Sequence, residues 1–297
     1  MKPDTDKTLM VVDSNYLCHQ AKHAYKSLSL NGAKTAVIFG FMKKIIKVSS
    51  VVKPTDIAFV WDSPSKHCLR RKLYPEYKMG REAKYVEDPE EKLLNEICFP
   101  QFWVLKDEVL PSLGFHNILS ADGYEGDDIM AELALRYDTG FVALVTGDND
   151  LLQMVRDGKC AIFHPKHNEY ITERDVFENY GINPEYFGMM KCLSGCDTDK
   201  VPGIPQIGEK RAVAYINGVL KETTIWFKRI EESGDIIERN FKLVVLPFDD
   251  GLRTMEMEKN SPNLKKYADV CAKYDMKSLL SNANIDAWEK ILSCLKG

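Results

Sequence analysis

Three carboxylates stand within four residues near the middle of this 297-residue chain, at Glu125, Asp127 and Asp128. They precede an apolar run over residues 129–134, so we expect them in the first turn of a helix. Each acidic side chain there stabilises the helix by ~0.3–1 kcal/mol through its interaction with the helix dipole. A single acid at this position would therefore need no other explanation. Residues three apart share a helix face, so Glu125 and Asp128 repel each other unless a cation lies between them. The segment therefore indicates a metal site.

Aspartates also follow the segments that we expect to be buried strands. The runs over 8–12, 56–61 and 141–145 are short, apolar and partly β-branched. The aspartates after them are Asp13, Asp62, Asp148 and Asp150. Strands alternating with helices predict a mostly parallel sheet with helices on both faces, and ligands bind at the carboxyl ends of such strands. Each aspartate alone is more simply a helix cap or turn residue; together they predict one acidic centre.

Oxygen ligands in this number suit Mg²⁺ or Mn²⁺. The seven carboxylates exceed what one Mg²⁺ needs, since that ion keeps several water ligands. Two ions about 4 Å apart would activate a water and stabilise the leaving oxygen of a phosphodiester, which is the physical case for a nuclease. A zinc site from His164, His167, Cys192 and Cys196 is less favoured, because their spacing matches no common zinc finger.

Composition narrows the class of protein further. The net charge of −4 argues against indiscriminate binding to polyanions, although it allows a local basic groove. No apolar run approaches the ~20 residues that span a membrane, and the first residues lack a signal-peptide core. Eight cysteines without a disulfide framework read as reduced thiols. We expect a monomer in a cytoplasm, with no membrane partner.

A basic stretch with interleaved tyrosines lies between residues 66 and 85. Over residues 66–84 it carries seven lysines or arginines against two acids: Lys66, Arg70, Arg71, Lys72, Lys78, Arg81 and Lys84. Basic groups with stacking rings suit a single nucleic-acid strand or a frayed end, and the alternative is a solvated, charged helix face. A helix-like run over 93–113 follows, which we expect to be interrupted at Pro100.

A glycine- and proline-rich turn after two further aspartates, Asp197 and Asp199, leads into a basic helix start. Gly203 and Gly208 lie in the turn, and Lys210 and Arg211 follow it. Backbone N–H groups and basic side chains at such a turn can hold a duplex phosphate. An ordinary helix–turn–helix corner is the alternative.

In this order and spacing, several of these segments form a recognisable set. The motifs are Val-Val-Asp at Asp13, Val-Trp-Asp at Asp62, Tyr-x-x-Tyr-Lys-x-x-Arg from Tyr74, Gly-Tyr-Glu-Gly-Asp-Asp from Gly123, Thr-Gly-Asp-Asn-Asp from Thr146, and Pro-Gly-Ile-x-x-Ile-Gly-Glu-Lys-Arg-Ala from Pro202. The chain thereby resembles the 5′-nuclease superfamily of flap endonucleases, phage 5′–3′ exonucleases and the 5′-nuclease domain of bacterial DNA polymerase I. Its length, without a polymerase region, is most similar to a stand-alone phage enzyme of the flap endonuclease or RNase H type.

The resemblance implies a PIN-like, three-layer α/β/α nuclease core with a mostly parallel sheet. A helical arch over about 66–105 would receive the free 5′ strand. Residues 1–171 would form the catalytic domain, and residues 172–297 a helix-hairpin or helix-two-turn-helix DNA-binding and C-terminal helical region. In relatives that hairpin grips the duplex backbone and often binds K⁺.

The resemblance also implies roles for individual residues. The first ion would be held by Asp13, Asp62, Glu125, Asp127 and Asp128, and the second by Asp148, Asp150, Asp197 and Asp199. Lys78 and Arg81 would stabilise the charge that develops on the scissile phosphate, and Tyr77 would stack on the neighbouring base. Other DNA contacts would come from Arg70, Arg71, Lys72, Lys84, Gly203, Gly208, Lys210 and Arg211. Cys196 departs from the polymerase-type pattern, because it replaces an aspartate near the second ion.

The implied function is a Mg²⁺-dependent, structure-specific 5′-nuclease, with Mn²⁺ able to substitute. It would cut 5′ flaps, nicks, frayed ends and RNA–DNA hybrids during primer removal in DNA replication or repair. Replication proteins such as a single-strand-binding protein or a clamp would be partners, in the bacterial host cytoplasm if the chain is phage-encoded. The alternatives are a PIN-type ribonuclease for structured RNA and a non-catalytic, structure-specific DNA-binding protein.

Overall fold

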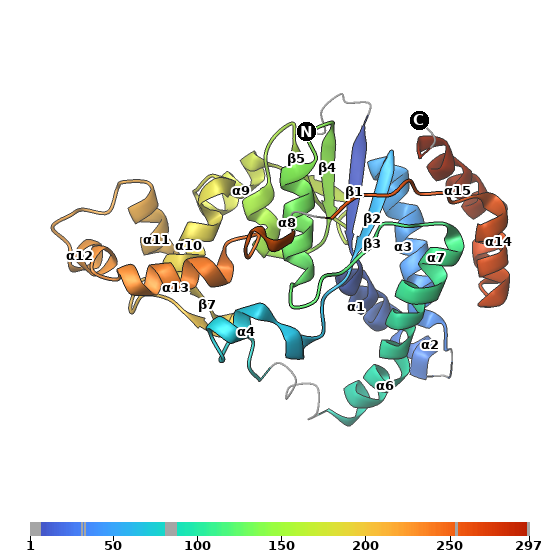
Figure 1. The fold of residues 1–297 in the computed structure, drawn as a ribbon, viewed down its shortest axis with the longest axis horizontal. Coiled ribbons are helices and arrows are strands. Elements are labelled where there is room, and N and C mark those ends of the chain that lie inside the picture. Colours follow the sequence, from blue (N-terminus) through green and yellow to red (C-terminus); the bar gives the residue numbers. More distant parts are fainter. Residues whose placement is uncertain (1–6, 31, 33, 81–87, 253–254, 296–297) are drawn as a thin grey trace.

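A single mostly parallel sheet organises the chain (Figure 1). The computed structural model describes residues 7–30, 32, 34–80, 88–252 and 255–295. The sheet has the strand order β3-β2-β1-β4-β5-β6. Its strands are β1 (Thr8–Asp13), β2 (Asp56–Val60), β3 (Ile118–Leu119), β4 (Phe141–Val145), β5 (Cys160–His164) and β6 (Glu169–Ile171). All neighbours pair in parallel except β5 and β6, which pair antiparallel.

The central strand β1 is buried on both faces, and successive side chains point to opposite layers. Met10 and Val12 belong to one apolar cluster, and Leu9 and Val11 belong to the other. In the parallel register Asp13 lies opposite Val60, and Val12 lies opposite Val145. The residues that follow β1, β2 and β4 therefore leave the same edge of the sheet.

Helices cover both faces. On the Met10 face they are α1 (Ser14–Ala24), α2 (Lys26–Leu30), α3 (Ala36–Val52), α6 (Pro89–Val104), α7 (Leu110–Leu113), α14 (Leu264–Lys273) and α15 (Asn282–Cys294). On the Leu9 face they are α8 (Gly126–Arg136), α9 (Glu173–Tyr180), α10 (Phe187–Ser194), α11 (Glu209–Ile216), α12 (Ile225–Glu231) and α13 (Gly234–Val244). This arrangement confirms the three-layer α/β/α prediction.

The segment that carries the basic stretch lies beside the edge from which α1 leaves the sheet (Figure 1). It contains the short helix α4 (Leu69–Leu73) and runs in turns to Gly80, and α6 begins at Pro89. The expected break at Pro100 is wrong, because α6 continues through it to Val104. A π-helical turn over Leu105–Val109 follows instead and joins α6 to α7. Whether the segment closes as an arch depends on residues 81–87, which lie outside the described residues.

Two glycines let the turn between α10 and α11 close tightly. Gly195 has a φ of +84°, and a Cβ there would come within 2.3 Å of the Gly203 nitrogen. A Cβ on Gly203 would in turn come within 2.2 Å of the Ser194 carbonyl carbon. The two segments pair as the antiparallel strands β7 (Gly195–Cys196) and β8 (Val201–Pro202). Gly203 therefore serves backbone packing, and Gly208 caps α11 at an exposed position.

The C-terminal helices α14 and α15 return to the sheet and pack on its Met10 face. Trp288 of α15 is fully buried and stacks on Tyr267 of α14 at 4.5 Å between ring centroids. Both belong to the Met10-face cluster, so residues beyond 172 contribute to both faces of the sheet. The division at residue 171 stays a prediction. None of the helices within the described residues is both long and apolar enough to cross a membrane.

Candidate metal centre

The strand ends bring three aspartates to one place. Asp13 caps α1, where its Oδ1 accepts from the Tyr16 N–H at 2.9 Å and its Oδ2 from the Thr146 hydroxyl at 2.9 Å. Asp62 accepts from the Gly126 N–H at 2.7 Å, which links β2 to the start of α8. Asp148 caps the 3₁₀ turn over Asn149–Met154 by accepting from the Asp150 N–H at 2.8 Å.

The helix start joins this group as the sequence predicted. Glu125 caps α8 in a capping box with Asp128, whose carboxylate accepts from the Glu125 N–H at 3.1 Å. Asp127 lies between them in the sequence, and the negative charges of Asp148, Asp13 and Asp62 raise its pKa. No hydrogen bond or ion pair involves its carboxylate among the described residues. Of the three acids, Asp127 is therefore the one without a hydrogen bond or ion pair to its carboxylate in this part of the structure, although the charge of Lys78 partly offsets the repulsion.

Asp128 has a different role from the predicted one. It is fully buried and forms a bidentate ion pair with Arg70, with Nη1–Oδ2 and Nη2–Oδ1 distances of 2.6 and 2.7 Å. Arg70 also donates from Nε to the Leu243 carbonyl at 2.8 Å, and Asp128 accepts from the Phe248 N–H at 2.9 Å. The predicted DNA contact by Arg70 is therefore wrong for this structure, because only 2% of the residue is exposed. The pair fastens α4 to α8 and to the chain after α13.

Burial, and after it the crowding of like charge, raises the pKa values of Asp13, Asp62 and Asp127. The pKa of Asp13 rises from its ordinary 3.8 to about 7, first through burial and then through Asp62 and Asp148. Burial, followed by Asp148 and Asp13, holds the pKa of Asp127 well above its usual range. The pKa of Asp62 is also raised, first by burial and then by Glu125. These acids compete for protons, which is the state that a bound cation relieves.

Lys78 lies beside this cluster in an unusual backbone conformation. Its φ is +52°, a left-handed value that only a few per cent of non-glycine residues adopt, and its N–H donates to the Asp199 carbonyl at 2.8 Å. The ammonium group forms an ion pair with Glu125. Burial lowers the pKa of Lys78, but Glu125 and Asp199 raise it more, so the net shift is upward and the group stays charged. The lysine predicted to be catalytic therefore lies at the acidic centre.

Tyr77 does not lie where a stacking partner for a base would be needed. Its ring is 2% exposed and packs with Cys192, Val201 and Leu243. Its hydroxyl donates to Glu125 Oε2 at 2.7 Å. The predicted stacking role is thus wrong for this structure, and Tyr77 orients Glu125 instead. The pKa of Glu125 is lowered because Lys78, Arg70 and these hydrogen bonds outweigh the opposing effect of burial.

A second group of ligand atoms lies next to the first. One oxygen each from Asp150 and Asp199 and the Cys196 sulfur lie within 4.8 Å of one another. Asp150 also forms an ion pair with Lys191 of α10. Asp197, predicted as a ligand, is exposed and lies outside this group, whereas Cys196, considered only for the less favoured zinc site, belongs to it. Within the described residues, neither His164 nor His167 joins a group of potential metal ligands.

The predicted nucleic-acid contacts divide by exposure. Lys72 and Lys210 are exposed, as a phosphate contact requires. Arg71 braces the basic stretch by donating from Nε to the Tyr77 carbonyl at 3.1 Å. Arg211 stacks on Trp226 at 3.8 Å from the ring centroid and donates to the Gln206 carbonyl at 2.5 Å. Arg81 and Lys84 lie outside the described residues.

Two residues of this centre were missed at the sequence level. Thr146 donates to Asp13 and accepts from the Asp148 N–H at 3.1 Å, so it couples two strand ends. Its position inside the Thr-Gly-Asp-Asn-Asp motif was the available signal. Lys191 carries no such signal, because it comes from α10 and reaches Asp150 only through the fold.

The two groups share an open cleft of about 420 Å³. It is lined by Tyr16, Lys78, Gly147, Asp148, Asn149, Asp150, Lys191, Thr198 and Asp199. Carboxylates that raise one another's pKa values, with oxygen atoms as nearly the only donors, fit a hard divalent cation. Asp13, Asp62, Asp127 and Asp148 could hold it, because their charges raise the pKa values of Asp13 and Asp127, and so could the group of Asp150, Cys196 and Asp199.

The chain is similar to several known proteins. A model of the 5′-3′ exonuclease, N-terminal resolvase-like domain matches residues 8–181. DNA polymerase I of Mycobacterium tuberculosis is 34% identical over 217 residues, which are 70% of this chain but only 23% of that protein. The 5′-3′ exonuclease of Aquifex aeolicus is 29% identical over 293 residues, covering 94% of this chain and 96% of that one.

A solved structure has a similar fold over the whole chain. It is the bacteriophage T5 D15 flap endonuclease in a pseudo-enzyme-product complex with DNA and metal ions. The TM-score is 0.67 at 20% identity, covering 98% of this chain and 100% of that one. The chain spans about a quarter of the polymerase relatives it matches.

The buried ion pair generates a prediction about stability. Replacing Arg70 with methionine should lower the free energy of unfolding by about 3–5 kcal/mol, because Asp128 is left as an unpaired buried charge. Lys72→Met, at an exposed position two residues along, should change it by less than ~0.5 kcal/mol. The measurement is urea denaturation of both variants. The double variant Arg70→Met/Asp128→Asn should recover part of the loss, and equal effects of the two single variants would contradict the assignment.

Carboxylate crowding generates a prediction about pH and metal ions. Because the pKa values of Asp13 and Asp127 are raised in the folded state, that state binds more protons above pH ~4, and the free energy of unfolding without metal falls as pH rises toward about 7. Asp127→Asn should therefore stabilise the metal-free protein at pH 7.5 by on the order of 1 kcal/mol, and less at pH 4.5.

Thermal melts in chelator and in millimolar Mg²⁺ provide the measurement. The wild-type Tm should rise with Mg²⁺ more than the Tm of Asp127→Asn, because the ion relieves repulsion that the variant already lacks. Asp269→Asn, at an exposed position of α14, is the control and should behave as wild type. If Asp127→Asn were no more stable than wild type in chelator, repulsion among the carboxylates would not lower the free energy of unfolding.

Proposed function

The chain belongs to the 5′-3′ exonuclease family, by its N-terminal, resolvase-like domain, and we propose that it is a divalent-metal-dependent, structure-specific 5′-nuclease. Its substrates in this proposal are phosphodiesters at 5′ ends, flaps and RNA primers. A role in replication or repair follows from such substrates. The proposal concerns the nuclease activity alone, which is the part of the polymerase relatives that this chain matches.

The observation that carries the proposal is the repulsion among four carboxylates at the carboxyl edge of the sheet. Asp13, Asp62 and Asp127 all have raised pKa values, and Asp148 raises two of them. Among the described residues, Arg70 pairs with Asp128, Lys78 with Glu125 and Lys191 with Asp150. Repulsion of this kind persists in a fold when a ligand cation uses it.

In this proposal the side chains around the cluster have separate roles in hydrolysis. A divalent ion bound by Asp13, Asp62, Asp127 and Asp148 would polarise the phosphodiester and lower the pKa of a water molecule. Lys78, kept charged by Glu125 and Asp199, faces the same cleft and can stabilise the charge that develops on the phosphate. Tyr77 and Arg70 hold Glu125 from behind, so that the lysine has a fixed anchor.

A second ion fits the group of Asp150, Cys196 and Asp199. Sulfur is a softer ligand than a carboxylate and suits Mg²⁺ poorly, so we propose weaker Mg²⁺ binding here than at the four-carboxylate group. Two-metal chemistry in this chain would then depend on how well the second group is filled.

The proposed DNA substrate contacts the protein on both sides of the cluster. Exposed Lys72 adjoins it from α4, and the α11 start, with Gly208 and Lys210 exposed, offers backbone N–H groups to a duplex phosphate. A K⁺ ion at the α10–α11 turn is part of the proposal. The proposed nuclease activity and DNA substrate are supported by two similar proteins. One is named a 5′-3′ exonuclease, and the other is a flap endonuclease solved with DNA and metal ions.

Cleavage of a 5′-flap duplex tests the proposal directly. With the flap strand labelled at either end, wild type should cut near the junction in Mg²⁺ but not in Ca²⁺. Asp148→Asn should reduce the rate by roughly 10²-fold or more, because one carboxylate of the ion-binding group is lost. The control is Asp269→Asn, far from the cleft on α14. Binding without cutting would indicate a structure-specific binding protein, and cleavage of hairpin RNA alone would indicate a ribonuclease.

Lys78 should act in the reaction more than in binding. Lys78→Ala should lower the single-turnover rate on a flap by roughly 10²–10³-fold, as loss of a transition-state donor does, with a change in Kd of only a fewfold. Lys72→Ala, an exposed lysine of the same segment, should weaken binding slightly and leave the bound rate unchanged. Kd values measured in Ca²⁺ separate the two effects. Equal losses of rate and affinity in Lys78→Ala would reduce Lys78 to a phosphate contact.

A further inference from the structure

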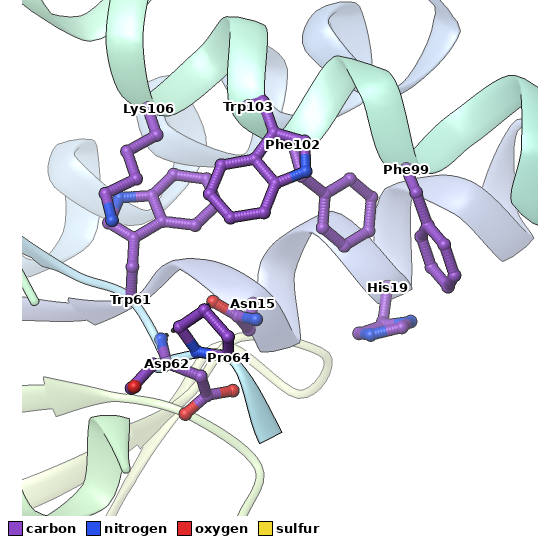
Figure 2. Close-up of a pocket in the computed structure, with 10 residues that line it drawn as sticks. Asn15, His19, Trp61, Asp62, Pro64, Phe99, Phe102, Trp103 and Lys106 are labelled. Carbon is purple, nitrogen blue, oxygen red and sulfur yellow. Dashed lines mark hydrogen bonds between the residues drawn. The ribbon is translucent and has the colours of Figure 1, made fainter. Parts of the chain in front are cut away.

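A second cavity, lined mainly by aromatic rings, adjoins the carboxylate cluster. It lies between α1, α6 and the chain after β2, and its volume is about 290 Å³. Figure 2 shows Phe99, Phe102 and Trp103 pointing from α6 toward Asn15, His19 and Pro64. Asp62 belongs to both places, because it lines this cavity and raises the pKa of Asp13 in the cluster. Whatever fills the cavity therefore lies next to the proposed reaction centre.

The rings form a wall that is partly open to solvent. Trp103 is 56% exposed and Phe99 is 37% exposed, although both are large apolar side chains. His19 meets Phe99 and Phe102 edge to face, with ring centroids 5.9 and 5.3 Å apart, so the wall is held in place. Exposed aromatic rings at a pocket are typical of a stacking platform for bases.

The polar groups of the cavity suit a neutral, planar ligand with hydrogen-bonding edges. The indole N–H of Trp61 is buried and finds no acceptor among the described residues. Burial, with Lys22 and His23, lowers the pKa of His19 to about 4, so the ring is uncharged near neutrality. Lys106 supplies a cation, which hydrogen-bonds Ser120 at 2.8 Å.

The position of the cavity relative to the sheet indicates which part of the proposed substrate would lie next to it. It lies at the β2 end of the cluster, whereas Asp150 follows β4 and its partner Lys191 comes from α10. Since β1 lies between β2 and β4, the cavity and the α10–α11 turn flank the cluster on opposite sides. If the duplex contacts α11, the unpaired strand passes the cavity.

We propose that this cavity binds one unpaired nucleobase of the substrate strand, on the 5′ side of the cleaved phosphodiester. The inference rests on the proposed nuclease function for the polarity of the strand. The volume of about 290 Å³ lies just below the roughly 300–1,000 Å³ of small-molecule pockets, which suits a ligand as small as one base. Trp103 and Phe99 stack on the base, and Lys106 faces the adjoining phosphate. The base thereby fixes the register of the strand over the carboxylates.

The test uses 2-aminopurine placed in turn at each unpaired position of a 5′-flap duplex, in Ca²⁺ so that no cutting occurs. In wild type one position should show strong quenching by stacking. Trp103→Ala should abolish the quenching at that position, whereas Trp103→Phe, which keeps a ring, should retain it. Phe177→Ala, an equally exposed aromatic on α9, is the matched control and should behave as wild type. Unchanged quenching in Trp103→Ala would overturn the proposal.

An affinity measurement gives the second readout. An abasic residue at the quenched position should weaken wild-type binding roughly tenfold, or about 1.4 kcal/mol, and should have no effect on Trp103→Ala. Deoxyadenosine monophosphate should bind wild type more tightly than deoxyribose 5-phosphate, which tests the base without any flap. Flap DNA that is cut in Mg²⁺ with no position-dependent quenching would overturn the pocket but leave the nuclease. If flap DNA were neither bound nor cut, the nuclease proposal would be wrong. If wild type also failed to prefer deoxyadenosine monophosphate over deoxyribose 5-phosphate, the base-binding proposal would be wrong as well.

Discussion

Repulsion among carboxylates at one edge of the sheet is the constraint on which the rest of this structure depends. Parallel pairing of β1 with β2 and β4 forces Asp13, Asp62 and Asp148 to leave the sheet at the same edge. The start of α8 then adds Asp127, and burial makes the repulsion stronger than in water. The fold tolerates this arrangement because the strands beneath it are buried on both faces and cannot move apart.

The surrounding cations limit the repulsion without removing it. Arg70 neutralises Asp128, Lys78 neutralises Glu125 and Lys191 neutralises Asp150, so three of the acids at this edge are paired. Each cation comes from a helix or turn outside the sheet, and each therefore also fastens that segment to the centre. The basic stretch after β2 is held at its base by Arg70 and Lys78, which join α4 to α8 and to the Asp199 segment. Electrostatics thus both opens the site to a cation and positions its walls.

The same edge has two unlike neighbours. Toward β4 it continues into an open polar cleft with Lys78, Asp150 and Lys191. Toward β2 it continues into the aromatic cavity of α1 and α6. A polyanion and a row of flat bases are the two chemical faces of a nucleic-acid strand, and these neighbours offer one surface to each. In the proposed function, this arrangement would let a chain with a net charge of −4 bind a nucleic-acid strand at one local site.

The sequence by itself determined the sheet and the acids that follow its strands. Short apolar runs ending in Asp13, Asp62 and Asp148 dictate buried parallel strands, and a parallel sheet has only one carboxyl edge. Only the tertiary structure decided which cation each acid meets. Arg70 looks like a DNA contact along the chain, yet it is buried against Asp128, 58 residues away. The aromatic cavity likewise unites α1, α6 and the chain after β2, and Cys196 joins Asp150 and Asp199. Local patterns specify strands and helix starts, whereas pairing between distant side chains depends on packing that no single segment encodes.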